Sequence, residues 1–402
     1  MRLTRDLTHA DATAVIADFV GSVCGLPLEE VVAINGTTRF DAAGLSLDSL
    51  TRLQLAAAVA NFFRLHESEL EDELLRRRSV SEWANTVMRG WAEGSKRLTF
   101  LTSGTTGERI PCVQHWDLLA QELAVHAEMF ATRRRVVGLV GARHIYGFLF
   151  CALLPRWLDV PFVDARNIAP AGLATFAQPG DLFVGFPLRW ELIAPDSVWP
   201  PEVVGVTSTG PIAASTITAL RAQGLAQMVE IYGSTQTGGV GWRDTTTDPL
   251  RLYAHWSLRV DGQLQRANPH SPGPPLVFEA PDVLALRAGG FEVLRRRDGA
   301  IQVAGVNVSC AQVAARLAEL PWVAECTVRL MRADEGSRLK AFVVLAQAMT
   351  PIAARTALRA WAGQHLSAAE IPTQLTLGAA LPRDSHGKLT DWSDHQPPEA
   401  PV

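Results

Sequence analysis

Short apolar runs separated by Gly, Pro and polar turns fill residues 96–297, and amphipathic stretches alternate with them. Runs such as Val136–Val140 and Leu182–Phe186 have the length and composition of buried strands, whereas 116–130 and 213–222 have helical periodicity. When strands alternate with helices, the helices cover both faces of the sheet. We therefore predict that this region is an α/β domain and the largest part of the protein.

Different patterns flank this region on both sides. Residues 1–92 carry helical patterns only, at 11–23, 48–65 and 81–88, which predicts a small all-helical domain. Residues 299–392 follow the order strand, helix, strand, strand, helix, strand, at 300–308, 311–320, 324–331, 339–345, 353–365 and 373–377, which predicts a small α+β domain. The Pro-rich end at 393–402 predicts a flexible tail. The predicted fold class is therefore multidomain, in agreement with a length of 402 residues, because one core rarely grows to that size.

The charge and composition exclude several kinds of partner. A formal net charge of -4 provides no basic surface for nucleic acid. No apolar stretch reaches the roughly 18 residues of a membrane helix, and Arg2, Arg5 and Asp6 interrupt any signal-like segment. The five cysteines are scattered without a metal-ligand spacing, which is typical of buried thiols in a reducing compartment. We expect a cytoplasmic protein that binds no nucleic acid and does not insert into a membrane.

A loop rich in Gly, Ser and Thr follows the first apolar run of the α/β region, Arg97–Leu101. Phosphate oxygens need several convergent donors, and such a loop supplies hydroxyl groups and closely approaching backbone N–H groups. The loop lacks the Gly-Lys-Ser/Thr of the Walker arrangement, and by itself it is equally compatible with a polar hairpin turn. The candidate phosphate ligands are Thr102, Ser103, Gly104, Thr105, Thr106 and Gly107.

A second apolar run, Val229–Tyr232, leads into a similar loop, Gly233–Gly239. The first loop resembles T-S-G-[ST]-T-G, Tyr232–Gln236 resembles Y-G-x-T-E, and Leu381–Lys388 resembles P-R-[ST]-x-x-G-K. These motifs occur in this order in the ANL superfamily of acyl-CoA synthetases, peptide-synthetase adenylation domains and luciferases. The resemblance to this superfamily extends over residues 97–390.

The resemblance implies a role for each matching residue. Enzymes of this superfamily use ATP and Mg²⁺ to join a carboxylic acid to AMP, and then pass the acyl group to a thiol. The resemblance implies that Lys388 promotes adenylation, that Gln236 approaches the metal and that Asp298 is the hinge of a mobile C-terminal domain. A cation and a metal at the α-phosphate stabilise the negative charge that gathers there. The residues implied in adenine and AMP binding are Tyr232, Gly233, Ser234, Thr235, Asp282 and Arg296.

The acid-binding pocket is implied by a segment that begins at His144 and resembles the superfamily motif with a His or aromatic residue. Nearby aromatic residues suit a slot for a flat acid, although isolated aromatic residues are commonly part of a core. The shortened adenylating region is similar to the hydroxybenzoate ligases of aryl-polyene and xanthomonadin-type pigment pathways, so we predict an aromatic acid such as a hydroxybenzoate. The residues assigned to the pocket are His144, Tyr146, Gly147, Gly210 and Gly238, and the aromatic slot adds Phe148, Trp190 and Trp242.

Three positions depart from the superfamily pattern. The loop lysine would fall at Ile110, so Arg109 is the adjacent positive charge. Gln236 stands in place of a glutamate, and a neutral carbonyl holds Mg²⁺ less strongly. Arg295 replaces the glycine before the hinge arginine, Arg296. These departures leave open a non-catalytic ATP- or AMP-binding protein of the same fold, and a fatty acid or an amino acid remains an alternative substrate.

The N-terminal helical region contains Asp48-Ser49-Leu50 at the start of a predicted helix. This segment resembles the D-S-L motif of acyl carrier proteins, in which the serine carries phosphopantetheine, and it implies a carrier-like domain. The alternative is that Ser49 only caps the helix, a role for which serine is well suited. The predicted thiol acceptor is therefore CoA, a separate acyl carrier protein or a phosphopantetheine arm on Ser49.

Overall fold

The computed structural model divides into two compact units, one ending at Leu294 and the other beginning at Arg295. This division lies close to the boundary predicted at 297–299. Among the described residues, no helix combines the length and the apolar character that crossing a bilayer requires. The structure describes residues 6–102, 110–193, 197–269, 273–303, 306–332, 334–347, 349–384 and 389–392.

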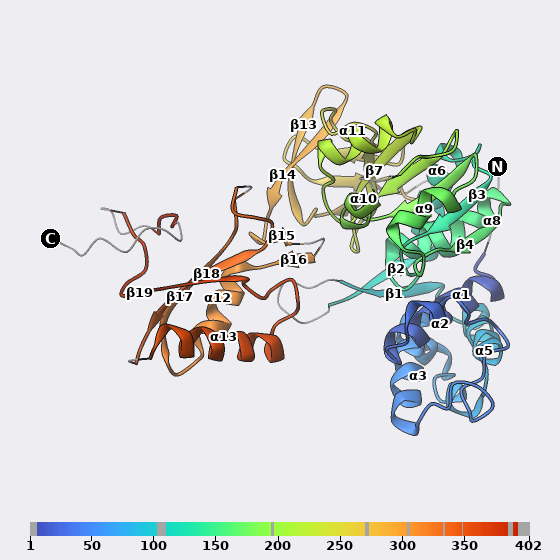
Figure 1. Ribbon diagram of the computed structural model, residues 1–402. Coiled ribbons are helices and arrows are strands. Elements are labelled where there is room, and N and C mark those ends of the chain that lie inside the picture. Colours follow the sequence, from blue (N-terminus) through green and yellow to red (C-terminus); the bar gives the residue numbers. More distant parts are fainter. Residues whose placement is uncertain are drawn as a thin grey trace. The chain divides into compact units, whose positions relative to one another are not determined.

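A seven-stranded sheet forms the centre of the first unit (Figure 1), with the strand order β4-β3-β5-β6-β7-β8-β9. Neighbouring strands from β4 to β7 are parallel, and β8 and β9 continue the sheet in antiparallel pairing. The bounds are β3 Arg135–Gly138, β4 Phe162–Asp164, β5 Asp181–Gly185, β6 Val204–Thr207, β7 Gln227–Ser234, β8 Gly238–Arg243 and β9 Arg251–Leu252.

Helices cover both faces of this sheet, because successive residues of its buried strands enter two different apolar cores. Val136 and Val184 belong to one core, and Val137 and Phe183 belong to the other. The predicted α/β region is therefore confirmed, as are the helices expected at 116–130 and 213–222. The first core contains α6 (Trp116–Met129), α7 (Ile145–Gly147), the π-helix η2 (Phe148–Leu153) and α8 (Leu154–Leu158); the second contains α9 (Pro170–Phe176), α10 (Pro187–Ile193) and α11 (Ala214–Ala222).

The strand order creates a switch point at β3, because the chain places β4 on one side of it and β5 on the other. In open parallel sheets, ligands bind in the crevice outside the carboxyl ends of the strands beside such a point. The segments that follow β3, β5, β6 and β7 therefore reach one edge of the sheet.

Antiparallel strands after the main sheet were not anticipated from the sequence. Three of the five have only three residues, too few for a periodic pattern to be recognised, and the other two, 282–287 and 290–296, contain charged residues among apolar ones. One small sheet has the order β10-β11-β12, and β13 pairs with β14. The bounds are β10 Trp256–Leu258, β11 Leu264–Arg266, β12 Leu276–Phe278, β13 Asp282–Arg287 and β14 Gly290–Arg296.

The helices predicted at 11–23, 48–65 and 81–88 are confirmed by α1, α3 and α5. They are followed by the antiparallel pair β1 and β2, which precedes the main sheet. The bounds are α1 His9–Val23, α2 Leu28–Val31, α3 Ser49–Phe63, η1 Leu65–Ser68, α4 Glu73–Arg76, α5 Val80–Glu93, β1 Arg97–Leu101 and β2 Pro111–His115.

The N-terminal helices do not have a core of their own. The Phe62 ring on α3 lies edge-on to those of Phe100 and Phe148, with ring centroids 5.0 and 5.9 Å apart. All three side chains belong to the core that also lines one face of the main sheet. The helices are therefore a layer of the first unit, and not the separate domain predicted at 1–92.

Buried ion pairs hold α1 against the segments that follow β3. Arg156 binds Asp11 at 2.9 Å, and Arg166 binds Asp18 at 2.5 Å and Asp164 at 2.7 Å. Asp11 and Asp18 are buried, so removal of either arginine would leave a carboxylate that neither water nor a cation compensates.

The second unit is a small α+β fold, as predicted. Its sheet has the order β17-β18-β19, with β17 antiparallel and β19 parallel to β18. The strand predicted at 300–308 is instead a pair of short antiparallel strands, β15 and β16. The bounds are β15 Ile301–Val303, β16 Val306–Val308, α12 Cys310–Ala318, β17 Val323–Leu330, β18 Leu339–Leu345, α13 Pro351–His365 and β19 Gln374–Gly378.

Replacement of Arg166 tests the packing of the N-terminal layer. We expect Arg166→Leu to lower the free energy of unfolding by about 3 kcal/mol or more, because it leaves Asp18 and Asp164 without their cation. Urea unfolding measures this change. The control is Arg259→Leu, since the pair Arg259–Asp261 is more than half exposed and its loss should leave stability unchanged. Equal effects of the two substitutions would contradict the account.

Candidate active site

The predicted pocket and nucleotide residues of the first unit meet at the carboxyl edge of the main sheet. His144–Gly147 follows β3, Gly210 follows β6, and Tyr232–Gly238 spans the end of β7 and the start of β8. Because β3, β5, β6 and β7 are consecutive parallel neighbours, these three segments share one edge. The sequence places these residues almost a hundred positions apart, and the sheet brings them together.

The buried side chain of Tyr146 links the ends of two strands at this edge. Its hydroxyl lies 3.0 Å from the Gly185 carbonyl and 3.1 Å from the Val206 carbonyl, and donates to them at the ends of β5 and β6. Burial raises the pKa of Tyr146, so the hydroxyl keeps its proton. Gly147 follows, and a Cβ atom there would lie 1.9 Å from the Gly141 carbonyl, which explains why glycine is required.

Two members of the predicted aromatic slot are core residues. Phe148 and Trp190 are fully buried, and Trp190 Nε1 donates to the Val206 carbonyl at 3.3 Å. These side chains fill the two sides of the sheet and do not form a slot, which corrects the sequence interpretation. Trp242 is partly exposed beside the guanidinium of Arg251, 5.0 Å from its ring centroid, and His144 is exposed.

Side chains of β2 contact one side of the turn that follows β7. Gln114 Nε2 donates to the carbonyl groups of Thr235 at 2.7 Å and Gln236 at 2.9 Å, and Cys112 Sγ approaches the Thr235 carbonyl at 3.2 Å. Gln114 is buried, so these bonds form away from water. The strand that leads out of the predicted phosphate loop therefore fixes the predicted nucleotide turn.

Residues of the unexpected antiparallel strands hold the other end of this turn. Arg266 donates to the Thr237 carbonyl at 3.1 Å, and Trp256 Nε1 donates to the Gly239 carbonyl at 2.8 Å. Within the turn, the hydroxyls of Ser234 and Thr237 lie 3.0 Å apart. Each carbonyl from residue 235 to 239 thus has a donor, since the Thr237 hydroxyl also donates to the carbonyl of residue 238.

Tyr232 and Asp282 form a hydrogen-bonded pair beside the turn, which we call the Tyr232–Asp282 pair. The Tyr232 hydroxyl donates to Asp282 Oδ2 at 2.7 Å, and the Tyr232 ring lies 5.5 Å from that of Phe291. Asp282 is buried at the start of β13. The structure therefore brings together two residues that the motif pattern assigns to adenine and ribose, although they are fifty positions apart.

The candidate metal ligand, Gln236, is exposed while its backbone carbonyl is held by Gln114. In the ranges that the structure describes, no group of three His, Cys, Asp or Glu side chains is arranged to hold a metal ion. Mg²⁺ is commonly held by one or two protein oxygens together with substrate phosphates. The amide oxygen of Gln236 fits that role, with ATP supplying most ligands.

Several predicted residues lie outside the described part of the chain. The phosphate-loop residues 103–107, Arg109 and Lys388 are among them. The loop's flanks are described: Thr102 N–H donates to the Ile110 carbonyl at 3.0 Å, and Ile110 N–H donates to the Thr102 hydroxyl at 3.2 Å. The roles of the loop and of the lysine stay predictions.

In the second unit, Arg296 and the predicted hinge residue Asp298 bind each other. The Arg296 guanidinium donates to both Asp298 oxygens, at 2.9 and 2.7 Å, and this contact lowers the pKa of Asp298. Asp298 also accepts from Ala300 N–H at 3.0 Å. The two residues thus form one local structure at the start of the unit.

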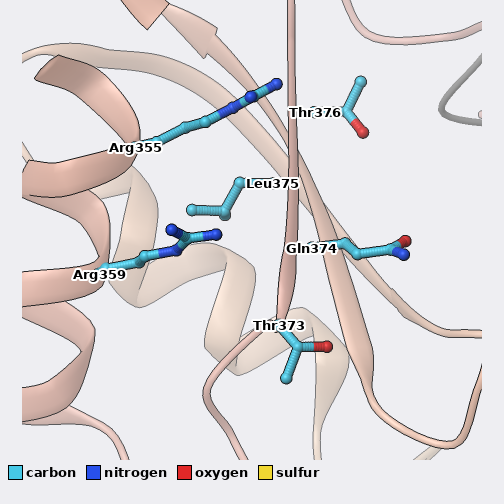
Figure 2. Close-up of a pocket in the computed structure, with 6 residues that line it drawn as sticks. All are labelled: Arg355, Arg359, Thr373, Gln374, Leu375 and Thr376. Carbon is cyan, nitrogen blue, oxygen red and sulfur yellow. The ribbon is translucent and has the colours of Figure 1, made fainter. Parts of the chain in front are cut away.

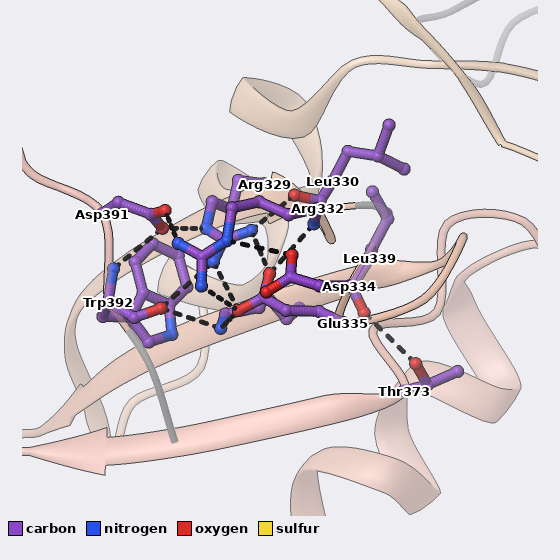
Figure 3. A network of polar contacts seen from close by, with 10 residues as sticks. Arg329, Leu330, Arg332, Asp334, Glu335, Leu339, Thr373, Asp391 and Trp392 are labelled. Atoms are coloured by element: carbon purple, nitrogen blue, oxygen red, sulfur yellow. Dashed lines mark hydrogen bonds and ion pairs between the residues drawn. The ribbon is translucent and has the colours of Figure 1, made fainter. Parts of the chain in front are cut away.

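A polar network anchors the end of the described chain to β17 and β18 (Figure 3). Lys340 is fully buried and donates to the Trp392 carbonyl at 2.9 Å and to Glu335 at 2.6 Å. Arg329 donates to the same carbonyl at 3.1 Å and pairs with Asp391 at 2.5 Å. Hydrogen bonds from Arg329 and Lys340 lower the pKa of Glu335. The segment just after the predicted catalytic lysine is therefore fixed to this sheet.

A shallow pocket of about 260 Å³ lies between α13 and β19 (Figure 2). Arg355 and Arg359 face it from successive turns of the helix, opposite Thr373–Thr376. In the described part of the chain neither guanidinium has an acidic partner. None of the predicted site residues lines this pocket.

Ser49 is exposed at the first turn of α3. Asp48 is the residue that caps the helix, because its carboxylate accepts from Thr51 N–H at 2.8 Å. The suggestion that Ser49 is the cap is therefore wrong, and its modification stays a prediction.

Sequence reasoning missed the residues that support the nucleotide turn: Gln114, Arg266 and Trp256. No local pattern marks Gln114, because its neighbours Val113 and His115 on β2 are exposed and Gln114 is the one buried residue of the strand. Arg266 and Trp256 carried no signal either, because their contacts depend on strands that the sequence pattern does not reveal.

Comparison with known proteins places this geometry in a family. The AMP-binding enzyme C-terminal domain matches residues 312–388. A 4-coumarate–CoA ligase of Cereibacter sphaeroides is 38% identical over 356 residues, which cover 87% of this chain and 84% of that protein. A 4-coumarate–CoA ligase of Halorhodospira halophila is 36% identical, covering 88% and 90%.

Solved structures share the fold. An amide bond synthetase from Marinactinospora thermotolerans superposes with a TM-score of 0.61 at 14% identity, covering 95% of this chain and 92% of that chain. A malonyl-CoA ligase in a ternary product complex gives 0.56 at 19% identity, covering 71% of each chain. The chain belongs to the ANL superfamily of adenylating enzymes. Within that superfamily, it is an AMP-forming acid–thiol ligase.

Removal of the Tyr232 hydroxyl tests whether the Tyr232–Asp282 pair contributes to nucleotide binding. We expect Tyr232→Phe to raise the KM for ATP about tenfold, because Asp282 loses the donor that orients it, a loss of about 1.4 kcal/mol. Pyrophosphate release at varied ATP concentration measures this. The fold should be unaffected, since the ring is retained. An unchanged KM would show that this pair does not bind the nucleotide.

Proposed function

We propose that this ligase activates an aromatic carboxylic acid, such as a hydroxybenzoate or hydroxycinnamate, and transfers the acyl group to CoA. The observation that carries the proposal is the convergence of three segments at the carboxyl edge of the sheet: His144–Gly147, Gly210 and Tyr232–Gly238. The relatives described as 4-coumarate–CoA ligases support both the aromatic acid and CoA.

Each of the predicted site residues has a role in the adenylation step. Tyr232 and Asp282 hold the adenosine part of ATP, and the phosphate loop holds its phosphates. The acid carboxylate attacks the α-phosphorus, pyrophosphate leaves, and Lys388 stabilises the charge that gathers on the phosphate oxygens. Bound Mg²⁺, approached by Gln236, would neutralise phosphate charge.

The shape of the edge suits a flat acid. The Tyr146 and Phe150 rings pack 5.1 Å apart beneath it, and Gly210 is partly exposed where another residue would place a side chain. A planar ring can lie against such a surface, with its carboxylate directed toward the nucleotide turn.

A phosphopantetheine arm on Ser49 or a separate acyl carrier protein is the second candidate acceptor. The exposure of Ser49 at the start of α3 supports it, because a modifying enzyme needs access to the hydroxyl.

A pyrophosphate-release screen over benzoates, cinnamates, fatty acids and amino acids tests the proposal. We expect kcat/KM to be at least about tenfold higher with hydroxylated aromatic acids than with the other classes, a difference of about 1.4 kcal/mol in transition-state binding.

We expect Lys388→Ala to abolish acid-dependent pyrophosphate exchange without changing the unfolding curve.

Thioester formation with added CoA identifies the acceptor, and a thioester on the chain itself would favour Ser49. ATP binding without pyrophosphate release for any acid would contradict the proposal and favour a non-catalytic binder.

A further inference from the structure

Glu122 on α6 lies directly behind the nucleotide turn. Its side chain is buried, and it accepts a hydrogen bond from Gly239 N–H. A Cβ atom at Gly238 would fall 2.3 Å from Glu122 Oε2, and one at Gly239 would fall 2.5 Å from Oε1. Gly238 also has a φ of +69°, which favours glycine. The two glycines therefore let the backbone reach this carboxylate, and any side chain there would separate them.

Arg266 is the cation that faces Glu122. It is almost fully buried, and it donates to the Thr237 carbonyl at 3.1 Å and to Gln121 Oε1 at 2.8 Å. A carboxylate thus holds the turn at Gly239 while its counter-charge holds the same turn at Thr237. A buried arginine is stabilised by an opposite charge, so both contacts depend on the charge of Glu122.

The other titratable groups packed around Glu122 are neutral. His126 Nε2 lies 3.7 Å from Glu122 Oε1 and 3.0 Å from the Tyr253 hydroxyl. Burial lowers the pKa of His126 and of His255 to about 3, and burial raises the pKa of Tyr253. Glu122 and Arg266 are therefore the charged pair of this cluster. Glu122 Oε2 has no hydrogen-bond partner among the described groups.

The ionisation of Glu122 changes near neutral pH. Burial raises its pKa to about 7, while Arg266 and the Gly239 N–H act in the opposite direction. The carboxyl group is therefore mostly ionised above pH 7 and mostly protonated below it. Protonation removes the charged acceptor from Gly239 and the counter-charge from Arg266.

We propose that Glu122 is a positioning residue for adenylation, which fixes the Thr237–Gly239 backbone for the adenylate when its carboxylate is ionised and loosens it when protonated. It acts through the turn from behind and touches neither ATP nor the acid. The proposal rests on the assignment of Tyr232–Gln236 to the adenylate under the proposed function.

Glu122→Gln separates charge from packing, because glutamine keeps the size and an acceptor oxygen but does not ionise. The measurement is kcat/KM for ATP in pyrophosphate release between pH 6 and pH 8. One group with a pKa near 7 makes the wild-type value fall about tenfold over this range. The ratio of variant to wild type, in which the ionisation of ATP itself cancels, should rise about tenfold from pH 8 to pH 6.

Two further variants complete the experiment. Glu128→Gln, on the exposed side of the same helix, should keep the ratio constant. Arg266→Gln removes the facing cation, which raises the pKa of Glu122. The pH at which kcat/KM for ATP falls on acidification should therefore rise by about one pH unit or more. A residue that only fills space would not produce this shift. Unfolding curves at each pH verify that every variant is folded.

A constant ratio for Glu122→Gln overturns the proposal. If that variant does not fold, Arg266→Gln decides alone. The proposal is then overturned if kcat/KM for ATP falls at the same pH in Arg266→Gln as in the wild type. Tyr232→Phe separates the role of Glu122 from the assignment of the turn to the adenylate. An unchanged KM for ATP in Tyr232→Phe removes the assignment of the turn to the adenylate. A raised KM together with a constant Glu122→Gln ratio removes only the role of Glu122.

Discussion

The backbone carbonyl groups of the turn after β7 cannot remain without donors where water is excluded, and the site is built around this requirement. Gln114 satisfies the carbonyls of Thr235 and Gln236 from one side. Arg266 and Trp256 satisfy those further along from the other. A turn held at so many points presents fixed groups to a ligand, and fixed groups need no reorganisation as charge develops.

This requirement gives the smaller parts of the first unit a function. The antiparallel strands after the main sheet carry Arg266 and Trp256 to the turn and Asp282 to Tyr232. The strand β2 carries Gln114 to the same turn, directly after the predicted phosphate loop. The N-terminal helices pack against β1 through the contact of Phe62 with Phe100, and thereby cover a core that would otherwise be exposed.

The sequence predicted the parts of the fold that depend on periodic burial. The helices α1, α3, α5, α6 and α13 and the strands β5 and β18 lie close to where hydrophobic patterning places them. The motif order also identified the superfamily, and Tyr232 and Asp282 do meet. Patterning failed where burial is not periodic. Strands β10, β11 and β12 have only three residues each, and the integration of the N-terminal helices depends on long-range contacts that a local pattern does not encode.

The site was predictable to the level of its motifs and no further. A motif names residues that are predicted to face a ligand, such as Tyr232, and omits those that hold the backbone of the turn from behind, such as Gln114. Tyr146 has a further role that the motif does not name, because its hydroxyl donates to carbonyl groups at the ends of β5 and β6. Buried polar side chains far from the motif in sequence reach the turn only through tertiary structure.

AMP binding to Gln114→Leu, measured by calorimetry, tests the central claim most directly. The substitution leaves two carbonyls of the turn without their donor, so we expect at least about a tenfold loss of affinity, equivalent to about 1.4 kcal/mol. Gln54→Leu, on the exposed side of α3, should bind AMP as the wild type does. Unchanged AMP affinity in a folded Gln114→Leu protein would contradict the claim that the braced turn is the nucleotide site.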